Sequence, residues 1–435
     1  MLIRTNRGLV LSENGTTGFK LLCNEALGIN TAEIPALVPL DRGDWLIGSS
    51  RGVVLAGSDL CTLTPVPPLD MVAVPAVARD PNNPARIFAS TGQANYDNGL
   101  YLSTDGAQTF AELGVRDQQR LYDRVVVSPA NAQKLFASGL RIRADKTGFD
   151  YFFATSSDGG ASFTEHVFAL HPDEYALEVL GAHPTQAKTL FGVTHADLGT
   201  GAKDRLLVSA NDGQDFVVAL SVDVLTSFAI DPTDGALYAG ARDGLWRSTN
   251  AGKTFTRIQS EAVHCLACTA STLYICTDQD GAAGLSVSKD HGDTLTRVMS
   301  FTDVTAMVSC AADAPTRVAC VMPWYDWTRE LSAGFVLDAG AGVKDASPAN
   351  DGAVTGTGDA SASGANPARS GGCSCTSMGH AEHHAAIPVC MCALLAVAIA
   401  RLRPRVRRVR PKCPTWLNQP GPRPLPPHQA HAGDS

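Results

Sequence analysis

The sequence predicts an all-β fold, a β-propeller of about seven four-stranded blades, with eight as the alternative count. Three observations predict it. A short turn motif recurs along most of the 435 residues, a strand–turn–strand pattern recurs in phase ahead of it, and Gly (40) and Pro (25) are abundant. The motif copies start at an average interval of about 46 residues, which is the length of one four-stranded blade. The propeller is therefore expected over residues 1–340.

The turn motif reads Ser-x-Asp/Asn-x-Gly-x-Ser/Thr-aromatic and lies between two apolar strands. Its clearest copies are residues 156–163 and 248–255, and the copies at 103–110, 209–216 and 288–295 each change one position. The residues assigned to these turns are Ser103, Asp105, Phe110, Ser156, Asp158, Gly160, Phe163, Ser209, Asn211, Gly213, Phe216, Ser248, Asn250, Gly252, Phe255, Ser288, Asp290 and Gly292.

Each residue type in the motif has a structural reason to be there. Gly takes a positive-φ position that a Cβ would disfavour. The Ser and Asp/Asn side chains hydrogen-bond to the backbone of their own turn. The aromatic residue is expected to pack between neighbouring sheets. These residues are therefore interpreted as turn-forming, and no catalytic role is assigned to them.

Both ends of the repeat array contribute to the blade count. Degenerate motif copies begin at Ser12 and near Ser58, and the first of these repeats lacks its first strand. Beyond the last copy, residues 304–310, 317–323 and 334–340 supply three strand candidates. A ring normally closes by completing one blade from both chain ends, which removes open sheet edges. A shared closing blade gives seven blades, which we favour, and a separate one gives eight.

Two pairs among the 12 cysteines are predicted to form hairpin disulfides, Cys268–Cys276 and Cys310–Cys320. Each pair is symmetric about the centre of a strand–turn–strand pattern, and cross-strand neighbours lie at about disulfide-forming distance. Such disulfides indicate an oxidising compartment. The alternative is four buried thiols.

Three further segments follow the predicted propeller. Residues 341–372 contain no Leu, Ile, Met or aromatic residue, which predicts a flexible linker. Residues 373–412 combine the pair Cys373 and Cys375, an apolar run at 385–400 predicted as a short helix, and an arginine-rich cluster. Residues 413–435 are Pro-rich and predicted to be disordered.

Two parts of the chain resemble known families. The turn motifs resemble the BNR/Asp-box repeats of sialidases, sortilin-type receptor domains, photosystem-assembly propellers and two-propeller xyloglucan hydrolases, over about residues 1–340. This resemblance implies the propeller and says little about function.

The second resemblance concerns the C-terminal segment. The order of linker, Gly372-Cys373-Ser374-Cys375, apolar run and arginines resembles the C-terminal sorting signals of myxobacterial surface proteins. It implies membrane retention through residues 385–400, processing at the cysteine element and display at the cell surface, with the arginines following the positive-inside rule. No secretory signal is visible at the start of the chain, so the N-terminus of the exported protein is expected upstream.

The charge pattern argues against nucleic acid as a partner. The net charge is −8, and seven positive charges lie in residues 401–412, so the rest of the chain carries −15. Phosphate contacts need a basic face, which such an acidic body does not offer.

No catalytic residue and no cofactor is assigned. Sialidases need an arginine triad, a Tyr–Glu pair and a Phe/Tyr-Arg-Ile-Pro motif, whereas Arg86-Ile87 lacks the proline. A glycoside hydrolase of another type needs two carboxylates about 5–10 Å apart. The acidic pairs considered for that role are Asp173 with Glu174, Asp278 with Asp280, and Asp326 with Glu330. Each pair is also consistent with a solvated loop or turn.

No metal ligand is assigned either. In His264-Cys265-x-x-Cys268, residues three apart on a strand face opposite sides, which argues against a shared ligand set. A better metal-binding composition lies in the sorting element, where the candidate residues are Cys373, Cys375, His380, His383 and His384.

Trp324, Tyr325 and Trp327 form an aromatic group in a predicted loop, and they are candidates for stacking on a sugar or gripping a peptide. The alternative is a packed loop over the closing blade. The leading functional hypothesis is a surface-tethered, monomeric, non-catalytic propeller that binds protein, peptide or glycan through its loops or central channel. The alternatives are a glycan-cleaving hydrolase and a purely structural surface protein.

Overall fold

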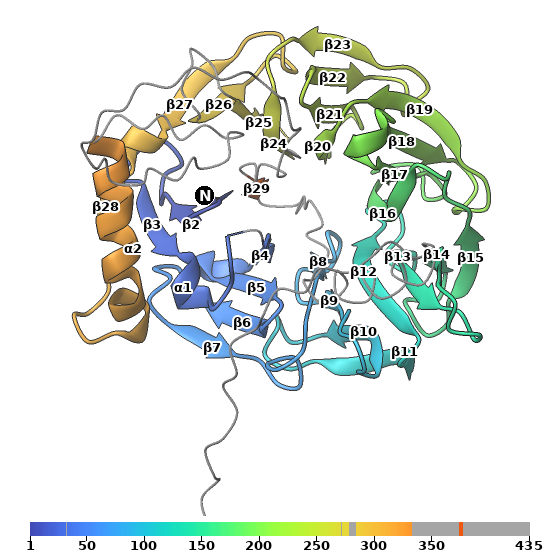
Figure 1. Ribbon diagram of the computed structural model, residues 1–435, viewed down its shortest axis with the longest axis horizontal. Coiled ribbons are helices and arrows are strands. Elements are labelled where there is room, and N and C mark those ends of the chain that lie inside the picture. The colour runs from blue at the N-terminus through green and yellow to red at the C-terminus, as the bar shows by residue number, and fades with distance from the viewer. Residues whose placement is uncertain (32, 271, 278–283, 333–373, 377–435) are drawn as a thin grey trace, which may run out of the picture. The chain divides into compact units, whose positions relative to one another are not determined.

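The computed structural model describes residues 1–31, 33–270, 272–277, 284–332 and 374–376, all within the compact unit Met1–Pro388. These residues form seven β-sheets, six of them wholly antiparallel, that follow one another around a ring (Figure 1). The predicted β-propeller is confirmed, and so is the count of seven blades. Within the described part of the chain, no helix has the length and apolar character to cross a membrane.

Six blades are consecutive four-stranded meanders, with the first strand of each on the inside of the ring (Figure 1). The first three are β4 (Ala36–Pro39), β5 (Trp45–Ser49), β6 (Gly52–Ala56) and β7 (Leu63–Pro65); β8 (Ala76–Arg79), β9 (Ile87–Ser90), β10 (Asn98–Ser103) and β11 (Ala111–Asp117); and β12 (Arg120–Val127), β13 (Leu135–Ile142), β14 (Phe149–Ser156) and β15 (Thr164–Phe168). The next three are β16 (Glu174–Ala182), β17 (Leu190–Ala196), β18 (Asp204–Ser209) and β19 (Val217–Val222); β20 (Leu225–Ile230), β21 (Leu237–Ala241), β22 (Gly244–Ser248) and β23 (Thr256–Gln259); and β24 (Val263–Thr269), β25 (Thr272–Thr277), β26 (Gly284–Ser288) and β27 (Thr296–Ser300).

The seventh blade closes the ring with strands from both chain ends. Its N-terminal strands are β1 (Leu2–Thr5), β2 (Gly8–Leu11) and β3 (Lys20–Cys23). On the outside, β28 (Ala306–Met307) pairs in parallel with β3, and on the inside, β29 (Ser374–Thr376) pairs with β1. The repeat that lacks its first strand is thus completed by later segments, as the shared-blade prediction required.

The hydrophobic core is divided into clusters that lie between neighbouring blades. One cluster contains Phe88 and Leu100 from the β8–β11 blade and Tyr122 and Phe152 from the β12–β15 blade. The rings of Tyr122 and Phe152 meet edge to face at 5.5 Å. Burying a side chain such as Phe or Leu contributes about 1.5–3 kcal/mol, so these seams hold the ring together.

The Ser156 turn illustrates how the repeated motif folds. Ser156 Oγ donates to Asp158 Oδ1 (2.8 Å) and accepts from the Gly160 amide (2.9 Å), while Asp158 Oδ1 accepts from the Ser162 amide (3.0 Å). Gly160 has φ +97°, and a Cβ there would lie 2.3 Å from Leu113 Cδ2. The same side-chain bonds to the amide four residues on recur at Ser103, Ser209, Ser248 and Ser288. In the Ser103 copy, Ala107 occupies the position that glycine has elsewhere.

The aromatic residues of the motif lie in the seams. Phe110 is buried, and Phe163, Phe216 and Phe255 are partly buried against the cores of their own seams. They lie between sheets, where the period-2 pattern of the sequence puts them.

The predicted disulfide Cys268–Cys276 is wrong. Thr269 pairs with Thr272, and this register places Cys265 opposite Cys276, with which it forms a disulfide (Cα–Cα 4.8 Å). Cys268 lies opposite Leu273 and is a buried thiol. The sequence symmetry suggested a turn centred on Thr272, three residues out of the observed register.

The predicted disulfide Cys310–Cys320 is also wrong. Cys320 is bonded to Cys23 and Cys310 to Cys61, with Cα–Cα distances of 5.4 and 5.3 Å. Pro315, read as a hairpin turn, instead begins helix α2 (Pro315–Ser332), a position where proline is favoured. The two disulfides therefore tie the C-terminal part of the propeller to its first blades. Three disulfides are typical of an exported protein, as expected.

Helices are few in the described residues. Helix α1 (Asn24–Leu27) follows β3, and α2 packs on α1 and β3 at the edge of the ring (Figure 1). Short 3-10 helices are η1 (Asp41–Gly43), η2 (Leu198–Thr200) and η4 (Phe301–Asp303). The predicted helix at 385–400, the linker at 341–372 and Cys373 lie outside the described residues, whereas Cys375 is in β29.

Candidate functional site

The inner strands of five blades surround a cavity of about 320 Å³ in the centre of the ring. Strands β4, β8, β12, β16 and β20 contribute its walls, and each is an end strand of its sheet. The lining is largely apolar, with Val77, Val126, Val179, Leu180 and Phe228 among its residues. An apolar cavity with a few polar groups is typical of a binding site.

Three polar residues of the cavity wall, Arg124, Glu178 and His195, belong to one connected charged cluster. Arg124 donates to Glu178 Oε2 through Nη2 (2.9 Å) and Nε (3.2 Å), joining β12 to β16 across a seam. His195 on β17 follows, with Nε2 3.7 Å from Glu178 Oε1 and Nδ1 3.1 Å from Asp204 Oδ2. All four residues are less than 10% exposed. We call Arg124, Glu178, His195 and Asp204 the channel cluster.

Packing and charge within the channel cluster alter its proton affinities. Burial lowers the pKa of His195, but the hydrogen bond with Asp204 and the charges of Glu178 and Asp204 outweigh it, so that pKa is raised overall. Burial and the Glu178 charge together raise the pKa of the adjacent Asp123 to about 7, against the lowering effect of the Ser138 hydrogen bond. The two carboxylates thus raise the proton affinity of the imidazole that lies between them.

One carboxylate oxygen of the channel cluster accepts no hydrogen bond from the part of the chain that the structure describes. Nη2 and Nε of Arg124 donate to Glu178 Oε2, whereas Oε1, which lies 3.7 Å from His195 Nε2, has no hydrogen-bond partner among the described residues. A buried carboxylate oxygen is costly to leave unpaired. Because Glu178 lines the cavity, a ligand that carries an N–H or O–H donor could supply the missing bond.

The aromatic residues expected to form a binding loop lie on helix α2 and face different surroundings. Trp327 is 1% exposed and packs edge to face on Phe301 at 5.7 Å, so it belongs to the core. Trp324 is partly buried against the same core, and Tyr325 is 59% exposed. The structure does not bring the three rings together on one surface, and the loop expected there is helical.

The acidic pairs considered for glycoside hydrolysis are not presented as open pairs where the structure describes them. Glu174 is held by Arg205, whose Nε and Nη2 lie 2.6 and 2.7 Å from its two oxygens. Asp326 lies 3.4 Å from Arg329. Asp278 and Asp280 lie outside the described residues.

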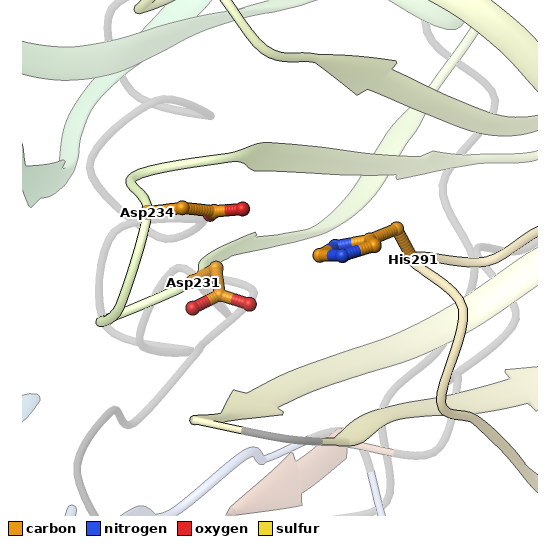
Figure 2. A group of neighbouring side chains, drawn as sticks. All are labelled: Asp231, Asp234 and His291. Atoms are coloured by element: carbon orange, nitrogen blue, oxygen red, sulfur yellow. The ribbon is translucent and has the colours of Figure 1, made fainter.

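A second cluster, which sequence reasoning missed, lies where the β20–β23 blade meets the β24–β27 blade. Asp231 and Asp234 come from the turn between β20 and β21, and His291 comes from the Ser288 turn of the next blade (Figure 2). One ligand atom from each residue lies within 4.8 Å of the others. Figure 2 shows the imidazole directed toward the two carboxylates. These residue types are metal ligands, and we call them the seam cluster.

Comparisons with known proteins add information on the fold alone. No protein-family model matches the chain, and no curated protein matches it. Similar solved structures include an ancestral GH74 enzyme, with 16% identity, a TM-score of 0.42, and 66% of this chain and 39% of that chain covered. The extracellular domain of a one-component system from B. thetaiotaomicron has 16% identity and a TM-score of 0.44, covering 65% of this chain and 36% of that one. The Hadza microbial sialidase has 14% identity and a TM-score of 0.37, covering 56% of this chain and 62% of that one. The chain thus spans less than two thirds of each of these proteins.

Proposed function

We propose that this protein is an exported binding propeller that takes an extended segment of a peptide or protein into its central cavity. The observation that carries the proposal is the buried Glu178 Oε1, which accepts no hydrogen bond from the described residues and lies in an apolar cavity lined by five end strands. The three disulfides support export. Retention at the cell surface through residues 373–412 is part of this proposal and rests on the composition of that segment.

The wall of the cavity suits a peptide for two reasons. End strands carry backbone N–H and C=O groups that no further strand of their sheet pairs with, and extended peptides bind to such edges by main-chain hydrogen bonds. The apolar side chains Val126, Val179 and Phe228 offer burial to alternate side chains of the same peptide.

The channel cluster supplies the polar end of the site. Glu178 Oε1 accepts a hydrogen bond from an amide, hydroxyl or ammonium group of the ligand. Arg124 and His195 hold the carboxylate in place from two sides. A peptide with apolar residues next to a Lys, Ser, Thr or Asn side chain fits this combination.

The test is a peptide selection on the full chain followed by a comparison of two matched variants. Peptides from a random display library are selected on immobilised protein, and their affinities are measured by fluorescence polarisation. Val126→Trp fills the cavity. Val217→Trp places the same ring on the outer strand β19, at a residue that is 65% exposed. We expect Val126→Trp to abolish binding of the selected peptides and Val217→Trp to leave it unchanged.

Two results would overturn the proposal. One is a selection that yields no peptide above background, which favours the structural surface protein. The other is equal binding by both tryptophan variants, each with an unchanged circular dichroism spectrum, which moves the site away from the cavity.

A further inference from the structure

The seam cluster brings together two carboxylates that no Lys or Arg among the described residues neutralises. Asp231 is buried, and among the described residues neither Asp231 nor Asp234 forms an ion pair with Lys or Arg. Arg247, on the adjacent strand β22, donates instead to the His291 carbonyl (3.0 Å) and to Asp293 (3.0 Å). The two carboxylates leave a local negative charge that a dication would balance.

The backbone of the turn uses one oxygen of each carboxylate. Asp231 Oδ1 accepts from the Thr233 amide (2.7 Å), and Asp234 Oδ1 accepts from the Ala236 amide (2.8 Å). The second oxygen of each carboxylate accepts no backbone hydrogen bond within this described turn, and it is the one that faces a ligand in this proposal. Cys268, the buried thiol, lies 3.7 Å from Asp231 Oδ2 and helps to orient it.

The imidazole is held in a similar way. The Tyr238 hydroxyl lies 3.1 Å from His291 Nδ1, which leaves Nε2 as the nitrogen that can coordinate. Metal-binding histidines almost always give their other ring nitrogen to an outer partner of this kind. Tyr238 is 1% exposed, so its position is fixed by packing.

A turn elsewhere in the molecule shows what the seam cluster lacks. Asp80 occupies the same place after β8 that Asp231 occupies after β20, and it is neutralised by Arg86 Nη1 at 2.8 Å. In the β20–β21 turn, the residue that corresponds to Arg86 is Ala236. The β20–β21 turn therefore keeps the first carboxylate, Asp231, but has no arginine to neutralise it. Asp234 and His291 add a second carboxylate and an imidazole.

We propose that Asp231, Asp234 and His291 form a binding site for a transition-metal dication of the Zn²⁺ class. Zn²⁺ is bound by imidazole nitrogen and carboxylate oxygen at about 2.0–2.2 Å, and three protein ligands leave a position for water. The imidazole favours such an ion over Ca²⁺ or Mg²⁺, which prefer all-oxygen sites. Asp234 and His291 are exposed turn side chains that close on the ion by rotation. The bound ion links two adjacent blades.

The experiment uses the full chain after removal of metals with a chelator. Zn²⁺ is titrated by isothermal calorimetry into the wild type, Asp234→Asn and His291→Gln. The matched control is His171→Gln, which removes an exposed imidazole from the loop before β16. We expect one Zn²⁺ equivalent to bind in the wild type and the control, and to be lost in both seam variants. Tyr238→Phe should weaken that equivalent by roughly 10-fold or more, because it removes the partner of Nδ1.

The cysteines and histidines of the C-terminal segment are a second source of Zn²⁺ binding. A parallel titration therefore uses a variant in which His380, His383 and His384 are replaced by Gln. Retention of one equivalent there, and a melting temperature that Zn²⁺ raises in that variant but not in His291→Gln, supports the seam site. Loss of all Zn²⁺ binding in that variant, or unchanged binding in His291→Gln, overturns the proposal. Binding of Ca²⁺ but not Zn²⁺ at the seam overturns the class of ion.

Discussion

Two turns of the propeller begin with Asp-Pro and share their backbone bonds, yet they balance their charge differently. In the β8–β9 turn, the Asp80 amide donates to the Arg86 carbonyl (2.9 Å), and in the β20–β21 turn, the Asp231 amide donates to the Ala236 carbonyl (2.8 Å). Both aspartates accept a second bond from the amide two residues on, at 2.8 and 2.7 Å. Their exposed fractions are 0% and 6%. The two turns hold their first aspartate in the same way, although the β20–β21 turn is one residue shorter, and they differ in the charged groups around that aspartate.

The residue across the seam changes together with the turn. Opposite Arg86 stands Gly159, the third residue after Ser156, where a Cβ would lie 3.6 Å from Arg86 Nη2. The third residue after Ser288 is His291, which faces Asp231 and Asp234. Both positions have left-handed backbone, with φ of 75° and 60°. In the first seam, the Asp80 carboxylate is therefore neutralised by an arginine of its own turn. In the second seam, candidate metal ligands come from both blades.

A third seam shows the arrangement with the signs reversed. Lys134 ends the β12–β13 turn, and its ammonium group pairs with Asp212, the third residue after Ser209. This pair joins two blades directly. The comparison indicates that the third residue after the serine can reach the neighbouring blade when it has a polar side chain, as Asp212 and His291 do.

The largest expected effect concerns the self-compensated turn. Arg86→Ala should lower the free energy of unfolding by about 3–5 kcal/mol, because it leaves the buried Asp80 carboxylate without its cationic partner. Urea unfolding followed by fluorescence measures it. The control is Lys203→Ala, which removes an exposed pair with Asp223 and should cost at most about 1 kcal/mol. An equal loss of unfolding free energy in the two variants would contradict the view that Arg86 neutralises Asp80 within its own turn.

A smaller loss of stability is expected from removing the serine of the motif turn in either seam. Ser156→Ala and Ser288→Ala should each cost about 1–3 kcal/mol, because a buried amide loses its acceptor. Only Ser288→Ala should also weaken Zn²⁺ binding, since His291 lies in that turn. Calorimetric titration of both variants separates these effects. A loss of Zn²⁺ affinity in Ser156→Ala would contradict the assignment.

The smallest effect concerns acid stability. Hydrogen bonds from the Ser162 hydroxyl and amide and from Ser156 hold the pKa of Asp158 at about 2, and Thr294 and Ser288 do the same for Asp290. Because the folded pKa is below the usual 3.8, this stabilisation is present above about pH 4 and is lost as the pH falls to about 2. Melting temperatures measured across this range should fall less in Asp158→Asn than in the wild type. The natural Asn211 and Asn250 copies show that the turn accepts an amide. Identical acid profiles would contradict this reading.

Much of the scaffold could be predicted because its signals are local. The serine, the Asp or Asn two residues on, and the residue four residues on bond within one turn, so their spacing along the chain is sufficient. The period of the turns predicted seven blades, and the missing first strand predicted closure from both chain ends. The channel cluster was not predicted, because Arg124 and Glu178 are 54 residues apart and their contact depends on the register of two inner strands.

The seam cluster left a weak signal in the sequence. Aligning the repeats by their Asp-Pro and Ser positions reveals Ala236 where Arg86 stands, and His291 where Gly159 stands. That substitution pattern has meaning only once the two turns are known to face each other across a seam.

The sequence by itself determined the propeller, its repeat length and the chemistry of its turns, since bonds between near neighbours and period-2 burial need no knowledge of distant contacts. Only the tertiary structure decided the disulfide partners of Cys23, Cys61 and Cys265, the helical state of residues 315–332 and the two clusters. The physical reason is closure. Because the ring closes, cysteines that are 249 and 297 positions apart in the sequence come within bonding distance. In the β24–β25 hairpin, the register decides which cysteine lies opposite Cys276.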